Sequence, residues 1–168
     1  MLVLEKEHFP RFHIGESLLP YNQCIFEEMG VLPALEAAGF PVKTGAQFHL
    51  SDASKAIRLV FRNGRFTRLT KTFQVEPAVF DDLLLNHARA SGADVREGCT
   101  VTGYTVDNGQ VTVQARTDGN GAQSFKASFL IDASGRANFT GNQGGLRTVH
   151  PRLKKLAVFG HFEWRGAG

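Results

Sequence analysis

The spacing of apolar and polar positions divides the first part of the chain into short elements. Residues 1–4 form an apolar run that ends in the acid Glu5, the pattern of a buried parallel strand. Residues 20–29 and 33–38 place apolar side chains at helical spacing, and a glycine follows each stretch as a stop signal. We therefore expect a strand followed by two short helices.

The middle of the chain changes to a strand-like pattern. Residues 43–50 and 56–61 are rich in strand-forming side chains, and Asn63-Gly64 is a strong hairpin signal that leads into residues 65–69. Such an antiparallel sheet, inserted into a strand–helix–strand frame, predicts a separate substrate-binding part. Residues 73–75 then lead the chain back to the strand–helix–strand part.

The second half begins with an amphipathic helix. Pro77 opens it, its apolar side chains recur at core spacing up to residue 91, and Gly92 ends it. A strand over residues 93–102 and a β-meander with turns at 108–109 and 118–121 follow. The meander ends in a further apolar strand, residues 129–131, directly before Asp132.

Composition restricts the class of protein. With 168 residues, 42% hydrophobic and 21% charged, the chain predicts a globular protein of one domain, or of one domain plus part of another. The net charge of +3 is dispersed among acidic and basic pairs, so we expect no nucleic-acid partner. No apolar run approaches the roughly 20 residues of a membrane-spanning helix.

The two cysteines, Cys24 and Cys99, are far apart and form no CxxC motif. This pattern argues against a zinc site or a disulfide scaffold and favours a reducing, cytoplasmic location. The histidines have no spaced partners, so we expect no metal site.

The first candidate site lies directly after the opening strand. An acid in the position of Glu5 is suited to accept both hydroxyls of a ribose. In the loop that follows, Arg11 supplies fixed positive charge and Gly15 allows close backbone approach. Ser17 is expected to cap a helix that begins near Pro20, whose unpaired N–H groups would suit a pyrophosphate.

The same residues carry a family resemblance. Glu5-Lys6, followed by the run 10–20 with Gly15-Glu16-Ser17, resembles the segment after the second strand of flavin-dependent halogenases. Related enzymes are the geranylgeranyl reductase-like oxidoreductases and the para-hydroxybenzoate hydroxylase class of monooxygenases. The resemblance implies that FAD is the cofactor, that the acid holds its adenosine ribose, and that the arginine lies near its phosphates.

A second motif supports this resemblance. The run from Asp132 to Arg136, Asp-Ala-Ser-Gly-Arg, is similar to the second flavin-binding motif of the class. Taken alone, it fits a plain Asx-turn equally well, with Gly135 at a positive φ. Its order and separation from Glu5 and Gly15 favour the flavin interpretation. The resemblance also places the backbone of Val101 against the adenine. The cofactor-binding candidates are Glu5, Lys6, Arg11, Gly15, Glu16, Ser17, Val101, Asp132 and Gly135.

One expected motif is absent from the sequence. Members of the class open with a strand and a GxGxxG turn that holds the FAD pyrophosphate, and the glycine cluster at 141–145 has the wrong spacing. We therefore expect an internal piece of a larger flavoenzyme, or the product of a truncated reading frame.

These patterns together predict an α/β fold, with mixed α+β character. Part of an FAD-binding Rossmann-like domain, residues 1–42 and 74–150, would be interleaved with an antiparallel sheet of a substrate domain, residues 43–73 and 151–168.

Lys43 is the catalytic candidate. In halogenases of this class a lysine near the start of the substrate domain directs hypohalous acid to an aromatic substrate, and Lys43 stands where the resemblance places it. The ordinary alternative is a solvated strand end. The resemblance implies a small aromatic or carrier-bound substrate and a separate flavin reductase. Two other functions remain open: an FAD-dependent monooxygenase or reductase, and a non-catalytic remnant unable to hold FAD.

Overall fold

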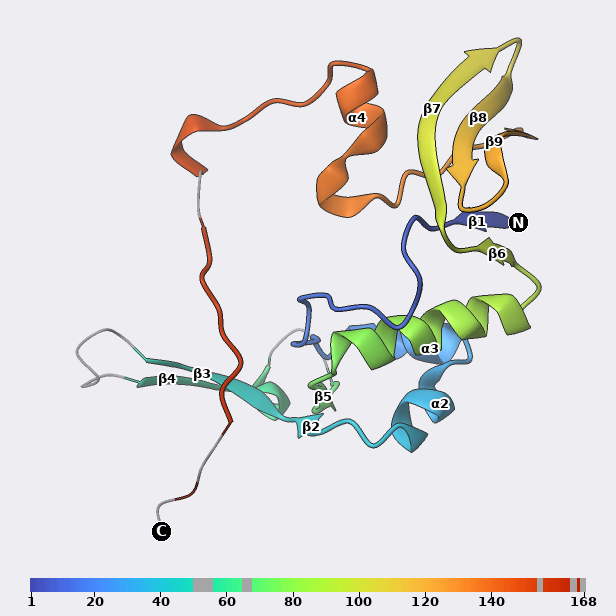
Figure 1. The fold of residues 1–168 in the computed structure, drawn as a ribbon. Helices are drawn as coiled ribbons and strands as arrows, with labels where there is room; N and C mark the ends of the chain where they lie inside the picture. The colour runs from blue at the N-terminus through green and yellow to red at the C-terminus, as the bar shows by residue number, and fades with distance from the viewer. Residues whose placement is uncertain (50–55, 65–67, 154–155, 164–165, 167–168) are drawn as a thin grey trace. The chain divides into compact units, whose positions relative to one another are not determined.

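The structure is a computed structural model that describes residues 1–49, 56–64, 68–153, 156–163 and 166 (Figure 1). The chain forms two compact units. The first comprises Met1–Tyr104 and Val113–Phe125, and the second comprises Thr105–Thr112 and Lys126–Gly168. Among the described residues, no helix is both long enough and apolar enough to cross a membrane.

The opening strand pairs in parallel, as the sequence predicts. Strand β1, Leu2–Leu4, lies beside β6, Asp94–Arg96, with Val3 opposite Val95 (Figure 1). A parallel pair requires a long crossover connection, which here ends in helix α3. Glu5 therefore stands at the carboxyl end of a parallel strand, where ligands of α/β folds bind.

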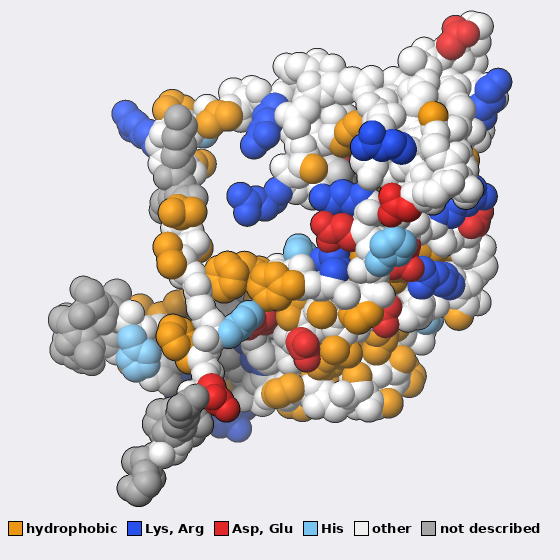
Figure 2. Space-filling model, viewed as in Figure 1, with side chains coloured by type: hydrophobic (Ala, Val, Ile, Leu, Met, Phe, Trp, Pro, Cys, Tyr) orange, Lys and Arg blue, Asp and Glu red, His pale blue; other side chains and the backbone are white. Residues whose placement is uncertain are grey.

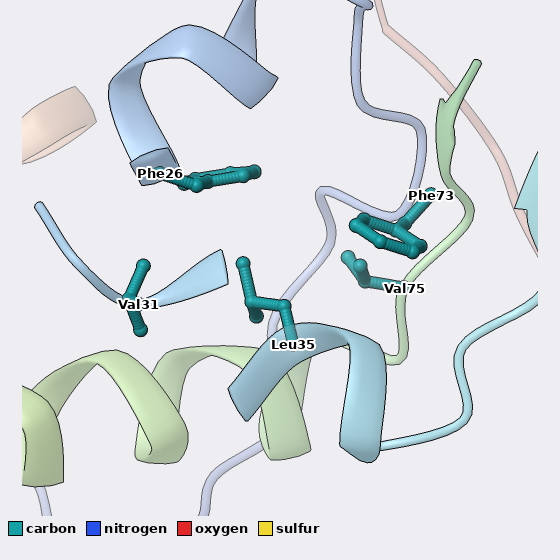
Figure 3. Close-up of a cluster of buried hydrophobic side chains, with 5 residues drawn as sticks. All are labelled: Phe26, Val31, Leu35, Phe73 and Val75. Carbon is teal, nitrogen blue, oxygen red and sulfur yellow. The ribbon is translucent and has the colours of Figure 1, made fainter. Parts of the chain in front are cut away.

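Three helices pack around the core of the first unit. They are α1, Asn22–Glu28, α2, Leu32–Ala37, and α3, Pro77–Ala90. The buried cluster between them consists of Phe26, Val31, Leu35, Phe73 and Val75 (Figure 3).

The first helix is less buried than its pattern predicts. Ile25 and Met29 were expected to share the apolar face of Phe26, but they are 44% and 45% exposed. Figure 2 shows hydrophobic side chains at the surface of the molecule. The seven-residue helix is too short to bury more than one turn of its apolar stripe.

The middle region forms two small antiparallel pairs. Strand β2, Val42–Lys43, pairs with β5, Thr72–Phe73, and β3, Gly45–His49, pairs with β4, Ala56–Val60 (Figure 1). The predicted strand over residues 43–50 is thus divided at Thr44, and its last residue lies outside the described part of the chain.

The Asn63-Gly64 hairpin prediction is wrong. Phe61–Asn63 form a short 3₁₀ helix, η1, and Gly64 has a φ of −69°, whereas the predicted turn needs positive φ. The chain leaves β4 through this helical turn, and β4 pairs with β3. Residues 65–67 of the predicted next strand lie outside the described residues.

The β-meander is confirmed. Strands β7, Cys99–Asp107, β8, Gln110–Thr117, and β9, Gly121–Ala127, form a three-stranded sheet. Asn108 and Gly109 have φ values of 48° and 76°, the left-handed pair of a tight hairpin turn.

The second unit contains mostly short helical turns. Its elements after β9 are η2, Gly135–Ala137, α4, Phe139–Gln143, and η3, Pro151–Leu153. The predicted strand at 129–131 is wrong: these residues have no strand pairing, and Phe129 and Ile131 are 88% and 81% exposed. An apolar run becomes a strand only beside another strand, and the described residues place none there.

Candidate functional site

The acid after β1 is fixed by its own backbone. The Glu5 N–H donates to the Arg96 carbonyl at 2.9 Å, and the Glu5 carbonyl accepts the Cys99 N–H at 2.8 Å. Its carboxylate turns back on the following loop, because Oε1 accepts the Glu7 N–H at 2.9 Å. The acid is thus held at the carboxyl end of β1 with its side chain at the entrance of the loop, and its role with ribose stays a prediction.

Arg11 is held by two carboxylates. Its Nε lies 2.9 Å from Glu7 Oε2, its Nη1 lies 3.4 Å from Asp81 Oδ2, and its guanidinium carbon is 4.6 Å from the ring centre of Phe9. The neighbouring Lys6 is exposed and forms only a surface pair with Glu7 at 3.5 Å. Arg11 therefore connects the loop to helix α3 in this structure, and a phosphate would share it with Glu7 and Asp81.

Asp81 has a role that only the structure reveals. Its position early in α3 fits a residue that favours a helix N-terminus. In the structure Asp81 contacts Arg11, which lies 70 positions away in the sequence. Asp81 Oδ2 also lies 3.4 Å from His13 Nδ1. Asp81 therefore fastens the loop at two points, a contact that no local pattern reveals.

Gly15 leaves open space beside the loop. Its backbone is almost fully extended, and a Cβ built on it would meet only His13 Nδ1 at 4.0 Å. The neighbouring Glu16 is exposed, and its Oε2 accepts the Gln74 amide at 3.4 Å. The glycine thus leaves free space beside the loop, and this space is available to a ligand.

The predicted cap by Ser17 is wrong. Helix α1 starts at Asn22 with Tyr21 as its N-cap, five residues too late for the Ser17 side chain to reach. The Leu19 N–H is satisfied instead by Asn22 Oδ1 at 3.1 Å. Ser17 forms an antiparallel bridge with Gln74, so this stretch is extended rather than part of a helix start.

The Ser17 hydroxyl contacts Lys43 instead. The Lys43 ammonium donates to Ser17 Oγ, and also to the Leu18 carbonyl at 3.1 Å. Its Nζ lies 5.6 Å from the ring centre of Phe61, within range of a cation–π attraction. Two residues predicted separately, from two different parts of the motif pattern, are thus in direct contact.

Lys43 also lines a shallow hollow along the β3–β4 hairpin, of about 270 Å³. Its other lining residues are Thr44, Gly45, Ala46, Gln47, Arg58, Leu59 and Val60. The lysine is half-buried rather than a freely solvated strand end.

Glu97 holds the start of the candidate loop in place at Phe9. Its Oε1 accepts the Phe9 N–H at 2.6 Å, and its Oε2 pairs with Arg89 Nη2. The hydrogen bond from Phe9, followed by the pairing with Arg89, lowers the pKa of Glu97. Val101, the predicted adenine neighbour, is half-buried on β7 shortly after this anchor.

We expect Glu97→Gln to weaken the acid dependence of folding. A lowered pKa means that the carboxylate stabilises the folded state above its ordinary value of 4.5, and that this stabilisation is lost as the pH falls through the folded-state pKa. Urea unfolding at pH 7 and at pH 3.5 to 4.5 measures the effect. The variant should lose less unfolding free energy between these pH values than the wild type does. The exposed Glu36→Gln should lose as much as the wild type. An equal loss in Glu97→Gln and the wild type would contradict the anchoring role of Glu97.

The second motif, in the second unit, is a closed hydrogen-bonded turn. Asp132 Oδ1 accepts the Ser134 N–H at 2.8 Å, and Oδ2 accepts the Thr140 N–H at 2.8 Å and its hydroxyl at 2.7 Å. The hydrogen bonds from Ser134 and then Thr140 hold the pKa of Asp132 well below its usual range. Gly135 has a φ of 58°, as predicted. Both carboxylate oxygens thus organise the loop and the start of α4, and the Asx-turn is present.

Comparison with known proteins identifies a protein family that this chain matches. The model of the family described as "Tryptophan halogenase" matches residues 50–154. A 1H-pyrrole-2-carbonyl-[peptidyl-carrier protein] chlorinase from Pseudomonas fluorescens is 32% identical over 96% of this chain and 39% of its own length.

Two solved structures share the fold. A flavoprotein/dehydrogenase from Cytophaga hutchinsonii has a TM-score of 0.83 and 31% identity, over 89% of this chain and 37% of that one. The myxobacterial chondrochloren halogenase, a variant of the FAD-dependent halogenases, has a TM-score of 0.72 and 34% identity, over 79% of this chain and 31% of that one.

These matches cover only part of the relatives, and the family match covers only part of this chain. The chain spans between 31% and 39% of the length of the curated relatives it matches. The family match begins at residue 50, so Lys43 and the loop at 5–17 lie outside it.

Proposed function

Because the chain belongs to the tryptophan halogenase family, we propose that it serves an FAD-dependent oxidation in which a halide is converted to hypohalous acid for an aromatic substrate. The family match is the observation that carries this proposal. The resemblance to flavin-dependent halogenases and the mixed α/β fold class, both predicted from the sequence, are confirmed.

The first unit offers residues that fit the adenosine diphosphate part of FAD. Glu5 would accept the ribose hydroxyls from the end of β1, and the free space beside Gly15 would admit the phosphates. Arg11 would add positive charge while Glu7 and Asp81 fix its position. The backbone of Val101 would line the adenine.

The second-unit motif would act through its backbone. Asp132 uses both carboxylate oxygens within its own turn, so it would shape the loop that carries Gly135 instead of binding the cofactor directly.

The chemistry would combine the cofactor with Lys43. When bound and reduced, FAD would supply two electrons to O₂, and the halide would supply two more, so that one proton is taken up and hypohalous acid and water are formed. Lys43 has three N–H donors, two of which are directed at Ser17 and Leu18. The third can donate to the oxygen of hypohalous acid and direct it to the substrate.

An electron-rich aromatic ring, free or carrier-bound, is the proposed substrate class. One relative is named for a pyrrole carried on a peptidyl-carrier protein. A separate flavin reductase would supply the reduced cofactor.

We expect the purified 168-residue chain to take up added FAD, and Gly15→Glu to weaken that uptake by about tenfold or more. The new side chain would fill the free space beside the loop and repel the phosphates. Quenching of flavin fluorescence on titration with protein measures the affinity.

Ser124→Glu is the matched control, because it adds the same charge at an exposed position of β9, outside the loop. It should bind FAD as the wild type does. A folded wild-type chain that takes up no FAD would overturn the proposal and favour a non-catalytic remnant. Equal affinities for Gly15→Glu and Ser124→Glu would remove Gly15 from the site.

A further inference from the structure

We propose that Ser17 positions Lys43: its hydroxyl and the Leu18 carbonyl together form a seat that fixes the lysine ammonium against the candidate cofactor loop. The use of this seat in halogenation rests on the proposed function, whereas the seat itself rests on contacts within the first unit. These contacts come from three backbone segments.

The loop segment behaves as an additional strand beside β5. The Val75 N–H donates to the Glu16 carbonyl at 2.8 Å, the Leu18 N–H donates to the Phe73 carbonyl at 3.3 Å, and Ser17 bridges Gln74. The Gly-Glu-Ser run is therefore held in place before any side chain of the seat is considered.

Lys43 approaches this segment from the opposite side of β5. In the β2–β5 pair Lys43 is directly opposite Thr72, so β5 lies between the lysine and Ser17. Neighbouring strands are about 4.8 Å apart, and only a long side chain can cross the strand between them. The lysine stem has the required length, and its ammonium ends on the far segment.

A second side chain of the β2–β5 pair also bonds to the loop segment. Thr72 is 1% exposed, and its hydroxyl donates to the Leu19 carbonyl at 3.3 Å. Both members of the Lys43–Thr72 pair therefore bond to the segment that follows Gly15. The loop is joined to β2 and β5 by two neighbouring side chains, and the position of Lys43 is determined by more than a single chance contact.

The seat is suited to an ammonium donor. The Ser17 hydroxyl and the Leu18 carbonyl both present oxygen atoms to Nζ, and the Phe61 ring at 5.6 Å favours a positive charge. Removal of the hydroxyl would leave one oxygen acceptor and a more mobile amine. Threonine would retain the hydroxyl at this position.

The seat can be tested by the chemical reactivity of the amine in the full 168-residue chain. Trace acylation with sulfosuccinimidyl acetate, read by peptide mass spectrometry, gives the labelling rate of Lys43 relative to the exposed Lys6. We expect Ser17→Ala to raise this ratio severalfold and Ser17→Thr to restore it. Circular dichroism checks that the variants are folded, and Ser124→Ala is the surface control.

The labelling result is independent of any flavin or halide. If folded Ser17→Ala left the Lys43-to-Lys6 labelling ratio unchanged, the seat would be overturned. It would also be overturned if Ser17→Thr raised this ratio as much as Ser17→Ala does. Bromination of a phenol probe with saturating reduced FAD, O₂ and bromide then tests the use of the seat: Ser17→Ala should lose product yield per bound FAD. A wild-type chain that binds FAD but brominates nothing would reject the proposed function, and the labelling ratio would still decide the seat.

Discussion

Gly45→Ala is expected to destabilise the β3–β4 hairpin by about 1–3 kcal/mol, the usual cost of forcing a methyl group into a packed position. A Cβ at position 45 would collide with the carbonyl oxygen of Leu59 and lie 3.3 Å from its carbonyl carbon. These are backbone atoms, so no side-chain rotation relieves the collision. The hairpin cannot shift freely either, because the Thr44 carbonyl accepts the Phe61 N–H at 3.0 Å.

Hydrogen exchange of the amides in β3 and β4, together with urea unfolding, measures this effect. Gly103→Ala is the matched control: it is also a strand glycine, but its Cβ would meet only the end of the Gln114 side chain at 3.1 Å, which can rotate away. Exchange in the hairpin should accelerate in Gly45→Ala alone. Equal protection in the two variants would show that β4 does not approach position 45 this closely.

Local sequence signals predicted the elements whose geometry is set locally. The Asn108-Gly109 turn needs two residues with positive φ, and these residue types supply them without help from the rest of the chain. Helix α3 likewise begins at a proline and ends just before Gly92, which has a φ of 91°. The acid after β1 was placed correctly because an apolar run of four residues is long enough for a strand and too short for a helix.

The failed predictions concern segments whose structure depends on distant partners. Asn63-Gly64 has the same residue types as the 108–109 turn, yet Asn63 ends the 3₁₀ helix η1 and Gly64 has a φ of −69°, so the pair forms no hairpin turn. Residues 129–131 have a strand composition, but the described residues provide no neighbouring strand for them. The same two residue types therefore predict a hairpin turn only where paired strands flank them, as β7 and β8 flank residues 108–109.

The candidate site follows the same rule. Motif resemblance selected Ser17 and Lys43 individually, but their contact spans 26 positions and crosses β5, so no spacing rule could have revealed it. The contact of Asp81 with Arg11 likewise spans 70 positions, so no local pattern reveals it. The sequence thus identifies residue types for the chemistry, and the fold determines which of them meet.

Lys43→Ala should abolish halogenated product, with a loss on the order of 10²-fold or more, while FAD affinity stays at the wild-type level. A positioned hydrogen-bond donor at the reacting group contributes this much in many enzymes. The amine is seated by Ser17 and Leu18 at one end of β2. Among the described residues, no hydrogen bond or ion pair joins it to the phosphate-binding candidates Arg11 and Gly15. Product yield by mass spectrometry and flavin fluorescence on the same samples separate the two effects.

Lys71→Ala removes a similar positive charge from an exposed position next to β5 and should leave the product yield unchanged. The competing reactions of this fold give a different result, because hydroxylation or double-bond reduction needs no amine to direct hypohalous acid. If Lys43→Ala retained full turnover with FAD bound, the reaction would belong to one of these classes. If it lost FAD instead, Lys43 would have to be reassigned to cofactor binding, since the seat formed by Ser17 and Leu18 joins it directly to the loop after Gly15.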